Sequence, residues 1–488
     1  MTDTLIVGGG TAGCVLAARL SEHPDHTVRL VEAGRVWRAP ADVPARLRAA
    51  TRLPIEAGAP WLWHYSISLA AADGAAHTGD IVRGKVIGGS SAVNGSYFAR
   101  AEPADFAAWS GVLGGARTWA FDAVLPAYRR SERDLDFGAR PWHGRSGPIP
   151  VRRSTDPVPL SADFADSCAA AGFAALADLN APTGAADGFA RVPCNIADGA
   201  RASTALAYLM PALNRPNLTV HGDTAATRIV FRGTRAIGVE VLRAGRRETV
   251  YADRIVLSAG AIETAALLMR SGVGAAEHLR ALGIAPVHSA PVGSWCVDHP
   301  EIGLEYCLPA PARAAVALEY VLTLGDLEFR PYTVAFTPGA GRLGVALMRP
   351  ESAGTVRLRT ADPATPPDIR LGYLRAERDR ARLRAAVGTA VALLHGMGAR
   401  PCADPMPRPP ARADAWLRAN LATSQHLSGT CRMGPADDAR AVVDERCRVH
   451  GVTGLSVVDL SVVPVPLGRG PQATVVMLAE HVAAHLIS

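Results

Sequence analysis

The chain has 488 residues, a formal net charge of +6 at pH 7 and 49% hydrophobic residues. This length allows two or three domain-sized units with a core large enough to bury a cofactor, and the mixed composition excludes a disordered or repeat protein. We see no basic stripe interleaved with aromatic residues, so no nucleic-acid partner is expected. No basic segment precedes the first apolar strand and no run reaches the ~18 apolar residues of a membrane span. A cytoplasmic location is therefore expected.

The first thirty residues carry a dinucleotide-binding pattern. An apolar strand at 4–7 leads into G-x-G-x-x-G, then a helix, then a second strand that ends at Glu32. The glycines allow a tight turn, close approach of a pyrophosphate and close helix–strand packing, and the acid accepts hydrogen bonds from a ribose. The pattern leaves NAD and FAD open. The predicted cofactor residues in this segment are Gly8, Gly10, Thr11, Ala12, Gly13, Glu32 and Ala33.

A second glycine-rich loop, RGKVIGGSSAVNG, occupies residues 83–95. Glycine lets backbone amides approach a flat polar ligand, and the apolar Val86, Ile87 and Val93 fit poorly with a flexible surface loop. A glycine-rich loop of this kind is expected to line a buried isoalloxazine ring, whereas a nicotinamide enzyme would not need it. The predicted cofactor residues here are Arg83, Gly88, Gly89, Ser90, Asn94 and Gly95.

Five blocks together resemble the glucose–methanol–choline (GMC) family of flavin oxidoreductases, in order from residue 4 to residue 486. They read RGKVIGGSSAVNGSYFAR, VLSAGAIETAALLMRSGVG, VGSWCVDHP, SQHLSGTCRMG and LSVVDLSVVPVPLGRGPQATVVMLAEH. The resemblance implies FAD as cofactor, with further contacts at Ala226, Ala259, Gly260, Asp459 and Leu460. Some members attach FAD through a histidine near the position of Val93, so we expect non-covalent FAD here.

The resemblance also assigns a role to His426, which on its own would be interpreted as a structural side chain. GMC enzymes move a hydride from an alcohol carbon to flavin N5, and a neutral histidine beside the flavin takes the hydroxyl proton. His426 matches that histidine. The helix that begins near Pro471, Gln472 and Ala473 would point free amides at the flavin. The family's second His or Asn is replaced by Gly470, so Gln472 is the candidate polar partner, with Arg469 as the alternative.

The predicted fold is α/β with two domains: a Rossmann-like FAD-binding domain and a substrate domain built on an antiparallel sheet. The FAD-binding parts are 1–149, 190–300 and 415–488, the last also catalytic, and the substrate-domain parts are 150–189 and 301–414. The alternating stretch 345–374 is expected to contribute to the antiparallel sheet.

No metal site is expected, because the histidines at 64, 77, 143, 221 and 288 lack metal-like spacing and are interpreted as structural or exposed. The eight cysteines form no C-x-x-C pair. We therefore expect them to be buried and not to form a dithiol redox site.

Three stretches, LPIEAGAP, NGSYFARAEPADF and WHGRSGPIPVRR, resemble the GMC dehydrogenase associated with mycofactocin, a peptide-derived redox cofactor. That resemblance implies oxidation of mycofactocinol, with electrons passed toward a respiratory-chain acceptor at the membrane surface and the enzyme in the cytoplasm or peripheral at the inner membrane face. Two alternatives remain open: an alcohol or choline-type GMC dehydrogenase or oxidase, and an FAD-containing hydroxynitrile lyase.

Overall fold

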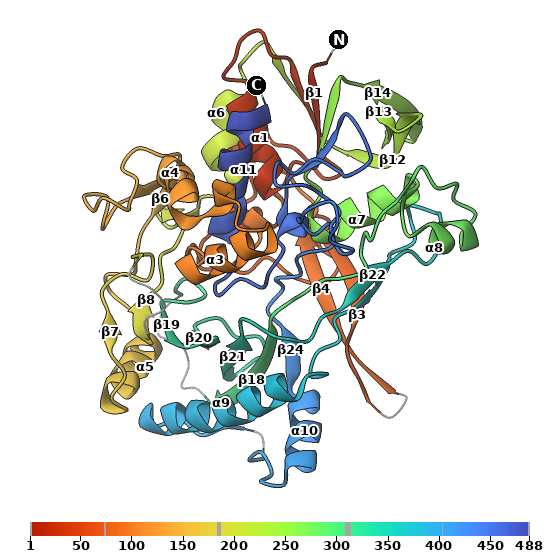
Figure 1. The fold of residues 1–488 in the computed structure, drawn as a ribbon. Coiled ribbons are helices and arrows are strands. Elements are labelled where there is room, and N and C mark those ends of the chain that lie inside the picture. The colour runs from red at the N-terminus through yellow and green to blue at the C-terminus, as the bar shows by residue number, and fades with distance from the viewer. Residues whose placement is uncertain (1, 73–74, 183–186, 308–313, 403, 487–488) are drawn as a thin grey trace.

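A computed structural model describes residues 2–72, 75–182, 187–307, 314–402 and 404–486 (Figure 1). Its centre is a five-stranded parallel sheet in the order β11-β2-β1-β15-β25. The strands are β1 (Thr4–Val7), β2 (Val28–Val31), β11 (Leu218–His221), β15 (Arg254–Leu257) and β25 (Leu455–Val457). Every residue of β1 is buried, as expected for a parallel strand covered on both faces.

Two helices from opposite ends of the chain pack together beside this sheet (Figure 1). Helix α1 (Thr11–Leu20) follows β1 directly, and α11 (Gln472–Leu486) ends the described chain. Arg19 of α1 donates to the buried carboxylate of Glu480 in α11 at 2.8 Å. This contact fixes the C-terminal helix against the last turn of α1. The starts of the two helices also lie together, because Oγ1 of Thr11 is 3.5 Å from Oε1 of Gln472.

The second large sheet has seven strands in the order β24-β18-β21-β20-β19-β8-β7. Its pairs are antiparallel except β7 with β8. The strands are β7 (Ala175–Leu176), β8 (Gly188–Arg191), β18 (Pro300–Cys307), β19 (Tyr320–Leu324), β20 (Leu327–Tyr332), β21 (Ala340–Leu347) and β24 (Leu421–Thr423). Helices α5 (Pro159–Ala170) and α9 (Glu377–Gly396) pack against this sheet, and α10 (Pro410–Ala419) packs on α9. A parallel sheet and this antiparallel sheet confirm the predicted two-part α/β fold class.

A four-stranded sheet, β22-β23-β3-β4, links the two parts. Its strands are β3 (Leu62–Ala72), β4 (Ala75–Gly84), β22 (Thr355–Arg357) and β23 (Asp368–Arg370). Strand β4 delivers Arg83 and Gly84 to the second glycine loop. The stretch 345–374 is therefore divided between this sheet and β21, whereas the sequence suggested one sheet. We propose that the domain boundaries follow the five segments predicted from the sequence, 1–149, 150–189, 190–300, 301–414 and 415–488.

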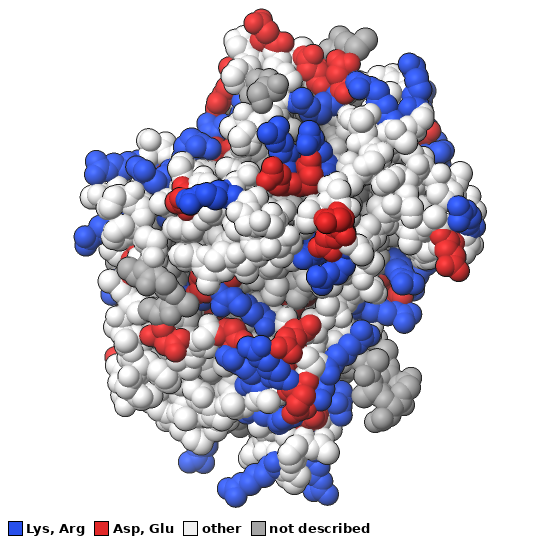
Figure 2. All heavy atoms as spheres, in the orientation of Figure 1, with Lys and Arg blue, Asp and Glu red and all other residues white. Residues whose placement is uncertain are grey.

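The remaining elements surround these sheets. They include a three-stranded sheet of β12 (Thr224–Arg232), β13 (Arg235–Arg243) and β14 (Arg246–Tyr251), and the helices α3 (Pro103–Val112), α4 (Phe121–Ser131), α7 (Gly260–Arg270) and α8 (Ala276–Ala281). Acidic and basic side chains intermingle on the face shown in Figure 2. Within the described residues, no helix combines the length and apolarity that a membrane crossing requires.

Candidate active site

A cavity of about 900 Å³ receives residues from both large sheets, from the second glycine loop and from the start of α11. Most of the predicted residues lie on its wall. They are Gly8, Gly10, Thr11, Ala12, Glu32, Ala33, Arg83, Gly89, Ser90, Asn94, Gly95, Ala226, Ala259, Gly260, His426, Asp459, Leu460, Pro471 and Gln472. Segments up to 464 residues apart in sequence thus converge on one cavity.

Three predicted residues do not line the cavity. A Cβ on Gly13 would lie 1.9 Å from the carbonyl oxygen of Gly8, so this glycine permits the close helix–strand contact. Gly88 has φ +90° and lies beside Ala205, which makes it a turn residue. Ala473 is fully buried in the first turn of α11. These three residues therefore do not contact the cavity; they support the backbone segments that line it.

Glu32, at the end of β2, is held by backbone amides. Its Oε2 accepts from the N–H of Gly9 at 2.7 Å, and its Oε1 accepts from the N–H of Gly34 at 2.8 Å. Burial raises the pKa of Glu32 to about 7, while these amides and the nearby Lys85 act in the opposite direction. The carboxyl group faces the cavity in a fixed orientation, as a ribose acceptor requires.

The wall fits a dinucleotide with a flat ring. A Cβ added to Gly10 would meet no protein atom closer than 3.7 Å, and one added to Gly260 would meet none within 4 Å, so both glycines leave room on the cavity side. Two buried donors, Nη2 of Arg83 and Nε2 of Gln472, have no protein partner. Unpartnered buried donors are costly unless a ligand accepts from them, and phosphate or flavin oxygens would do so.

His426 sits in a loop that is anchored on both sides. Its backbone N–H donates to Oδ1 of Asp298 at 2.7 Å, and the other carboxylate oxygen of Asp298 accepts from Thr423 at 2.5 Å. The preceding residue, Gln425, has φ +67° and accepts from the N–H of Val82 at 2.9 Å through its side chain. The loop therefore holds the imidazole against the cavity with little freedom.

The partner of the His426 ring is a second histidine, His299. The two Nδ1 atoms lie 2.9 Å apart. Burial lowers the pKa of His299 to about 3, with Arg330 adding to the effect. Burial, His299, Arg330 and Arg83 hold the pKa of His426 well below its ordinary value. Both rings are therefore neutral near pH 7.

The sequence interpretation gave His299 no role, although it quoted the Asp-His-Pro stretch that contains it. The signal was a histidine directly before an alternating strand, β18. What the sequence could not provide was the pairing, because 127 residues separate the two histidines.

Gly470 lies where the family resemblance leads one to expect a second polar side chain. A Cβ there would lie 3.0 Å from Cδ1 of Tyr97 and 3.6 Å from Cε1 of His426. Arg469 points elsewhere, to the carboxylate of Glu102 at 2.7 Å. Gln472 lines the cavity, with its Oε1 near the hydroxyl of Thr11. Tyr97 therefore occupies the space beside the histidine.

The seven-stranded sheet contributes charged side chains to the cavity, and these charges are already paired with one another. Arg330 donates to Glu301 at 2.8 Å and to Glu328 at 2.7 Å. Glu301 also accepts from the hydroxyls of Tyr332 and Ser424, each at 3.1 Å. The carboxylate of Glu301 is thus surrounded by donors from its own chain.

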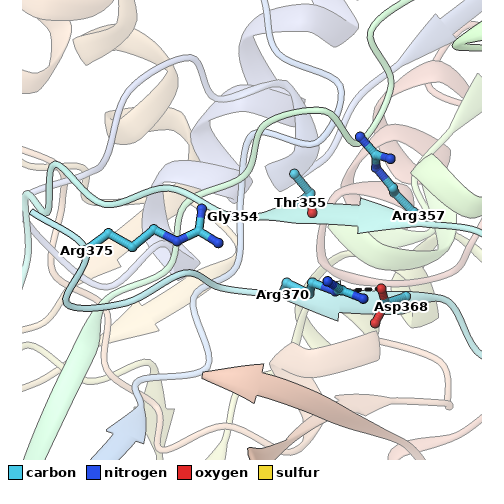
Figure 3. A pocket seen from close by; sticks show the side chains of 6 residues that line it. All are labelled: Gly354, Thr355, Arg357, Asp368, Arg370 and Arg375. Carbon is cyan, nitrogen blue, oxygen red and sulfur yellow. Dashed lines mark hydrogen bonds and ion pairs between the residues drawn. The ribbon is translucent and has the colours of Figure 1, made fainter. Parts of the chain in front are cut away.

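A hollow of about 300 Å³ on β22 and β23 is lined by three arginines, Gly354, Thr355 and Asp368, and Figure 3 shows the hydrogen bond from Arg370 to Asp368. It contains none of the predicted residues.

The side chains of Glu132, Asp134 and His143 lie close enough to hold a metal ion, but Arg100 and Arg153 pair with the two carboxylates. His143 is 2% exposed, and its hydrogen bonds to Asp178 and Glu132 raise its pKa.

Sequence and structure comparisons place the chain among known proteins. The family model described as GMC oxidoreductase matches residues 2–301, and a second with that description matches residues 350–479. An uncharacterised GMC-type oxidoreductase from a thcA 5′ region of Rhodococcus erythropolis is 44% identical, over 99% of this chain and 98% of that protein. The 5-(hydroxymethyl)furfural oxidase of Methylovorus sp. is 32% identical over the full length of both chains.

Two further proteins extend the comparison. The oxygen-dependent choline dehydrogenase of Vibrio vulnificus is 32% identical, over 99% of this chain and 93% of that protein. The crystal structure of pyridoxine 4-oxidase from Mesorbium loti superposes with a TM-score of 0.91 at 31% identity, covering 99% of both chains.

Proposed function

This chain belongs to the GMC oxidoreductase family, and from that premise we propose that it oxidises a neutral alcohol with His426 as the catalytic base. It is an FAD-dependent oxidoreductase acting on CH–OH groups. The observation that carries the proposed mechanism is that His426, on the cavity wall, is paired with a second neutral histidine, the buried His299, whose Nδ1 atom lies 2.9 Å from that of His426.

The pair can be assigned a proton arrangement. The backbone of Leu467 forms a hydrogen bond with the His299 ring that acts to raise its pKa, so Leu467 offers an accepting carbonyl. Nδ1 of His299 already faces His426, so this bond belongs to Nε2–H. Nδ1 of His299 then carries a lone pair and accepts from Nδ1–H of His426. The consequence is that Nε2 of His426 keeps its lone pair for a substrate hydroxyl.

FAD, when bound, supplies the hydride acceptor for the alcohol carbon. It would be held by the glycines of the two glycine-rich loops, by Glu32 and by the unpartnered donors of Arg83 and Gln472. We propose that it is bound without a covalent link, because the aliphatic Val93 offers no nucleophile. His426 takes the hydroxyl proton, which makes loss of the hydride from the same carbon easier.

The charges near His426 favour a neutral substrate over a cation. Arg83 disfavours a protonated imidazole and would repel a quaternary ammonium group placed nearby. Glu301 and Glu328, the carboxylates that could attract such a group, are already paired with Arg330. Two aromatic rings that could bind a cation are already covered by cations of the protein itself: Arg342 lies 4.7 Å over the ring of Phe336, and Lys85 lies 4.3 Å over the ring of Trp63. A choline-like alcohol would therefore find few free partners.

Among neutral alcohols we propose mycofactocinol as the substrate, on the resemblance of residues 53–60, 94–106 and 142–153 to the mycofactocin-associated dehydrogenase. We further propose that the electrons pass to a respiratory-chain acceptor at the membrane surface. An alcohol oxidase acting on small neutral alcohols is the second candidate. A hydroxynitrile lyase is the third candidate, because Gly470 replaces the second His or Asn that the family resemblance leads one to expect.

Anaerobic mixing of the yellow holoenzyme with mycofactocinol, simple primary alcohols and a cyanohydrin separates these functions. We expect rapid bleaching of the flavin absorbance with mycofactocinol and slow bleaching with simple alcohols. Cyanohydrin cleavage without bleaching would instead identify a lyase. Hydrogen peroxide formed at the turnover rate in air would identify an oxidase, and its absence a dehydrogenase.

A further inference from the structure

Two cysteines that lie far apart in sequence meet at the surface of the substrate-domain sheet. Cys307 ends β18, and Cys402 lies in the segment after α9; their Sγ atoms are 3.4 Å apart. The surrounding backbone is already fixed, since the N–H of Cys402 donates to the carbonyl of Glu305 at 2.7 Å and Pro401 bridges to Tyr306. This juxtaposition corrects the expectation that the cysteines are all buried and form no dithiol.

The other cysteines differ from this pair in exposure. All eight cysteines lie in the described residues, and only Cys307 and Cys402 are exposed. Burial raises the pKa of the remaining thiols, which keeps them protonated and out of reach of solutes. These are Cys14, Cys168, Cys194, Cys296, Cys431 and Cys447.

We propose that Cys307 and Cys402 form a peroxide-oxidisable dithiol that closes to an intramolecular disulfide. The sulfur atoms need to approach by roughly 1.4 Å to reach the S–S bond length of about 2.0 Å. Both cysteines are exposed, so neither sulfur is packed in the core. The bond would connect the end of β18 to the chain beyond α9, across 95 residues.

The reaction balances with hydrogen peroxide as the oxidant. Either sulfur can donate in the hydrogen bond that joins the two thiols, so either cysteine can supply the attacking thiolate. That thiolate attacks one peroxide oxygen, the O–O bond breaks, and a sulfenic acid and hydroxide result. The sulfur of the other cysteine then displaces the sulfenic oxygen as water. Two electrons pass from the thiols to the peroxide, and two water molecules form in total.

The position of the bond predicts an effect on stability and none on the reaction. Strand β18 runs from Pro300, next to His299, to Cys307, a distance of roughly 23 Å along the strand. Closing a long loop removes conformational freedom from the unfolded chain. The oxidised enzyme should therefore unfold at a higher temperature and keep its rate of alcohol oxidation.

The test uses the holoenzyme treated with hydrogen peroxide, excess peroxide being removed before assay. Native thiol titration should find two reactive thiols before treatment and none after it, and peptide mapping without reductant should join the Cys307 and Cys402 peptides. Dimedone present during the peroxide treatment should label the sulfenic acid formed on the remaining cysteine in Cys307→Ser and in Cys402→Ser but leave the wild type unlabelled. Cys168→Ala, which removes a buried cysteine, should still form the bond.

Three results would overturn the proposal. The first is dimedone labelling of the wild type to the same extent as the single variants. The second is two thiols that still titrate after excess peroxide. The third is a disulfide-linked dimer in place of a monomer with an internal bond.

Discussion

His299 and His426 face each other through their Nδ1 atoms at 2.9 Å, with the two ring planes at 79°. Only one proton fits between two such nitrogens, so one ring donates and the other accepts, and the bond of His299 to the Leu467 backbone decides which. Because His299 lies directly before β18 and His426 lies in the loop after β24, the substrate-domain sheet positions the base. His299 is therefore a positioning residue in the proposed mechanism.

Replacement of His299 tests this role. His299→Leu removes the acceptor for Nδ1–H of His426 and should lower the rate of flavin reduction by roughly a hundredfold to ten-thousandfold, because the base then no longer has a fixed tautomer. His299→Gln offers an amide oxygen and should retain more of the rate. Stopped-flow reduction and its pH profile measure both. Equal rates in the two variants, at equal FAD content, would show that His299 only fills space.

Gly470 should not tolerate even a methyl group. Gly470→Ala places a Cβ 3.0 Å from Tyr97 and 3.6 Å from His426, so the tyrosine ring must shift beside the base. We expect kcat/KM for the alcohol to fall roughly tenfold, or about 1.4 kcal/mol. Gly111→Ala is the matched control, because a Cβ there meets nothing within 4 Å. An unchanged kcat/KM in Gly470→Ala would show that Tyr97 is not part of the wall that orients the substrate.

The buried His143 predicts a pH-dependent stability. Burial acts to lower its pKa, but hydrogen bonds to Asp178 and Glu132 outweigh burial and raise it. A folded pKa above the unfolded value of about 6.5 means that the stabilisation is complete below that pH and is lost as pH rises through the folded pKa.

His143→Asn should therefore lower Tm most at pH 6, by the equivalent of about 3 kcal/mol, and less at pH 9. His64→Asn, at an exposed histidine, is the control. Thermal melts of the holoenzymes measure both. A Tm deficit that is the same at pH 6 and pH 9 would contradict a charged His143.

The charges near the base predict discrimination between two alcohols of one shape. 3,3-Dimethylbutan-1-ol is the neutral isostere of choline, so any difference in kcat/KM reports the cationic charge. We expect at least a tenfold preference for the neutral alcohol, about 1.4 kcal/mol, because Arg83 repels a cation near His426 and the carboxylates of Glu301 and Glu328 are already paired with Arg330. Arg342→Gln frees the face of Phe336 and should narrow the preference. Preference for choline by the wild type would contradict the proposed substrate class.

The nucleotide end of the site could be predicted from sequence because its residues are local. One strand, one glycine turn and one acid define it, and Gly8, Gly10 and Glu32 all line the cavity. Gly13 and Gly88 belong to the same motifs but only support the backbone, because spacing cannot distinguish a ligand contact from a packing contact.

The substrate end could not be predicted in the same way. The pairing of His299 with His426, the screening of Glu301 by Arg330 and the meeting of Cys307 with Cys402 all depend on strand register in one antiparallel sheet. Register is set by tertiary packing, and single motifs do not encode it. Tyr97, which fills the space beside Gly470, had no sequence signal of its own.

The most direct test of the proposed chemistry is anaerobic flavin reduction in wild type and His426→Ala, compared at equal FAD content. The variant should stay yellow, because His426 is absent from the nucleotide end of the wall. Its rate of reduction by mycofactocinol should fall by roughly a hundredfold to ten-thousandfold, the usual contribution of a general base. A variant that is reduced as fast as the wild type would contradict the assignment of His426 as the base.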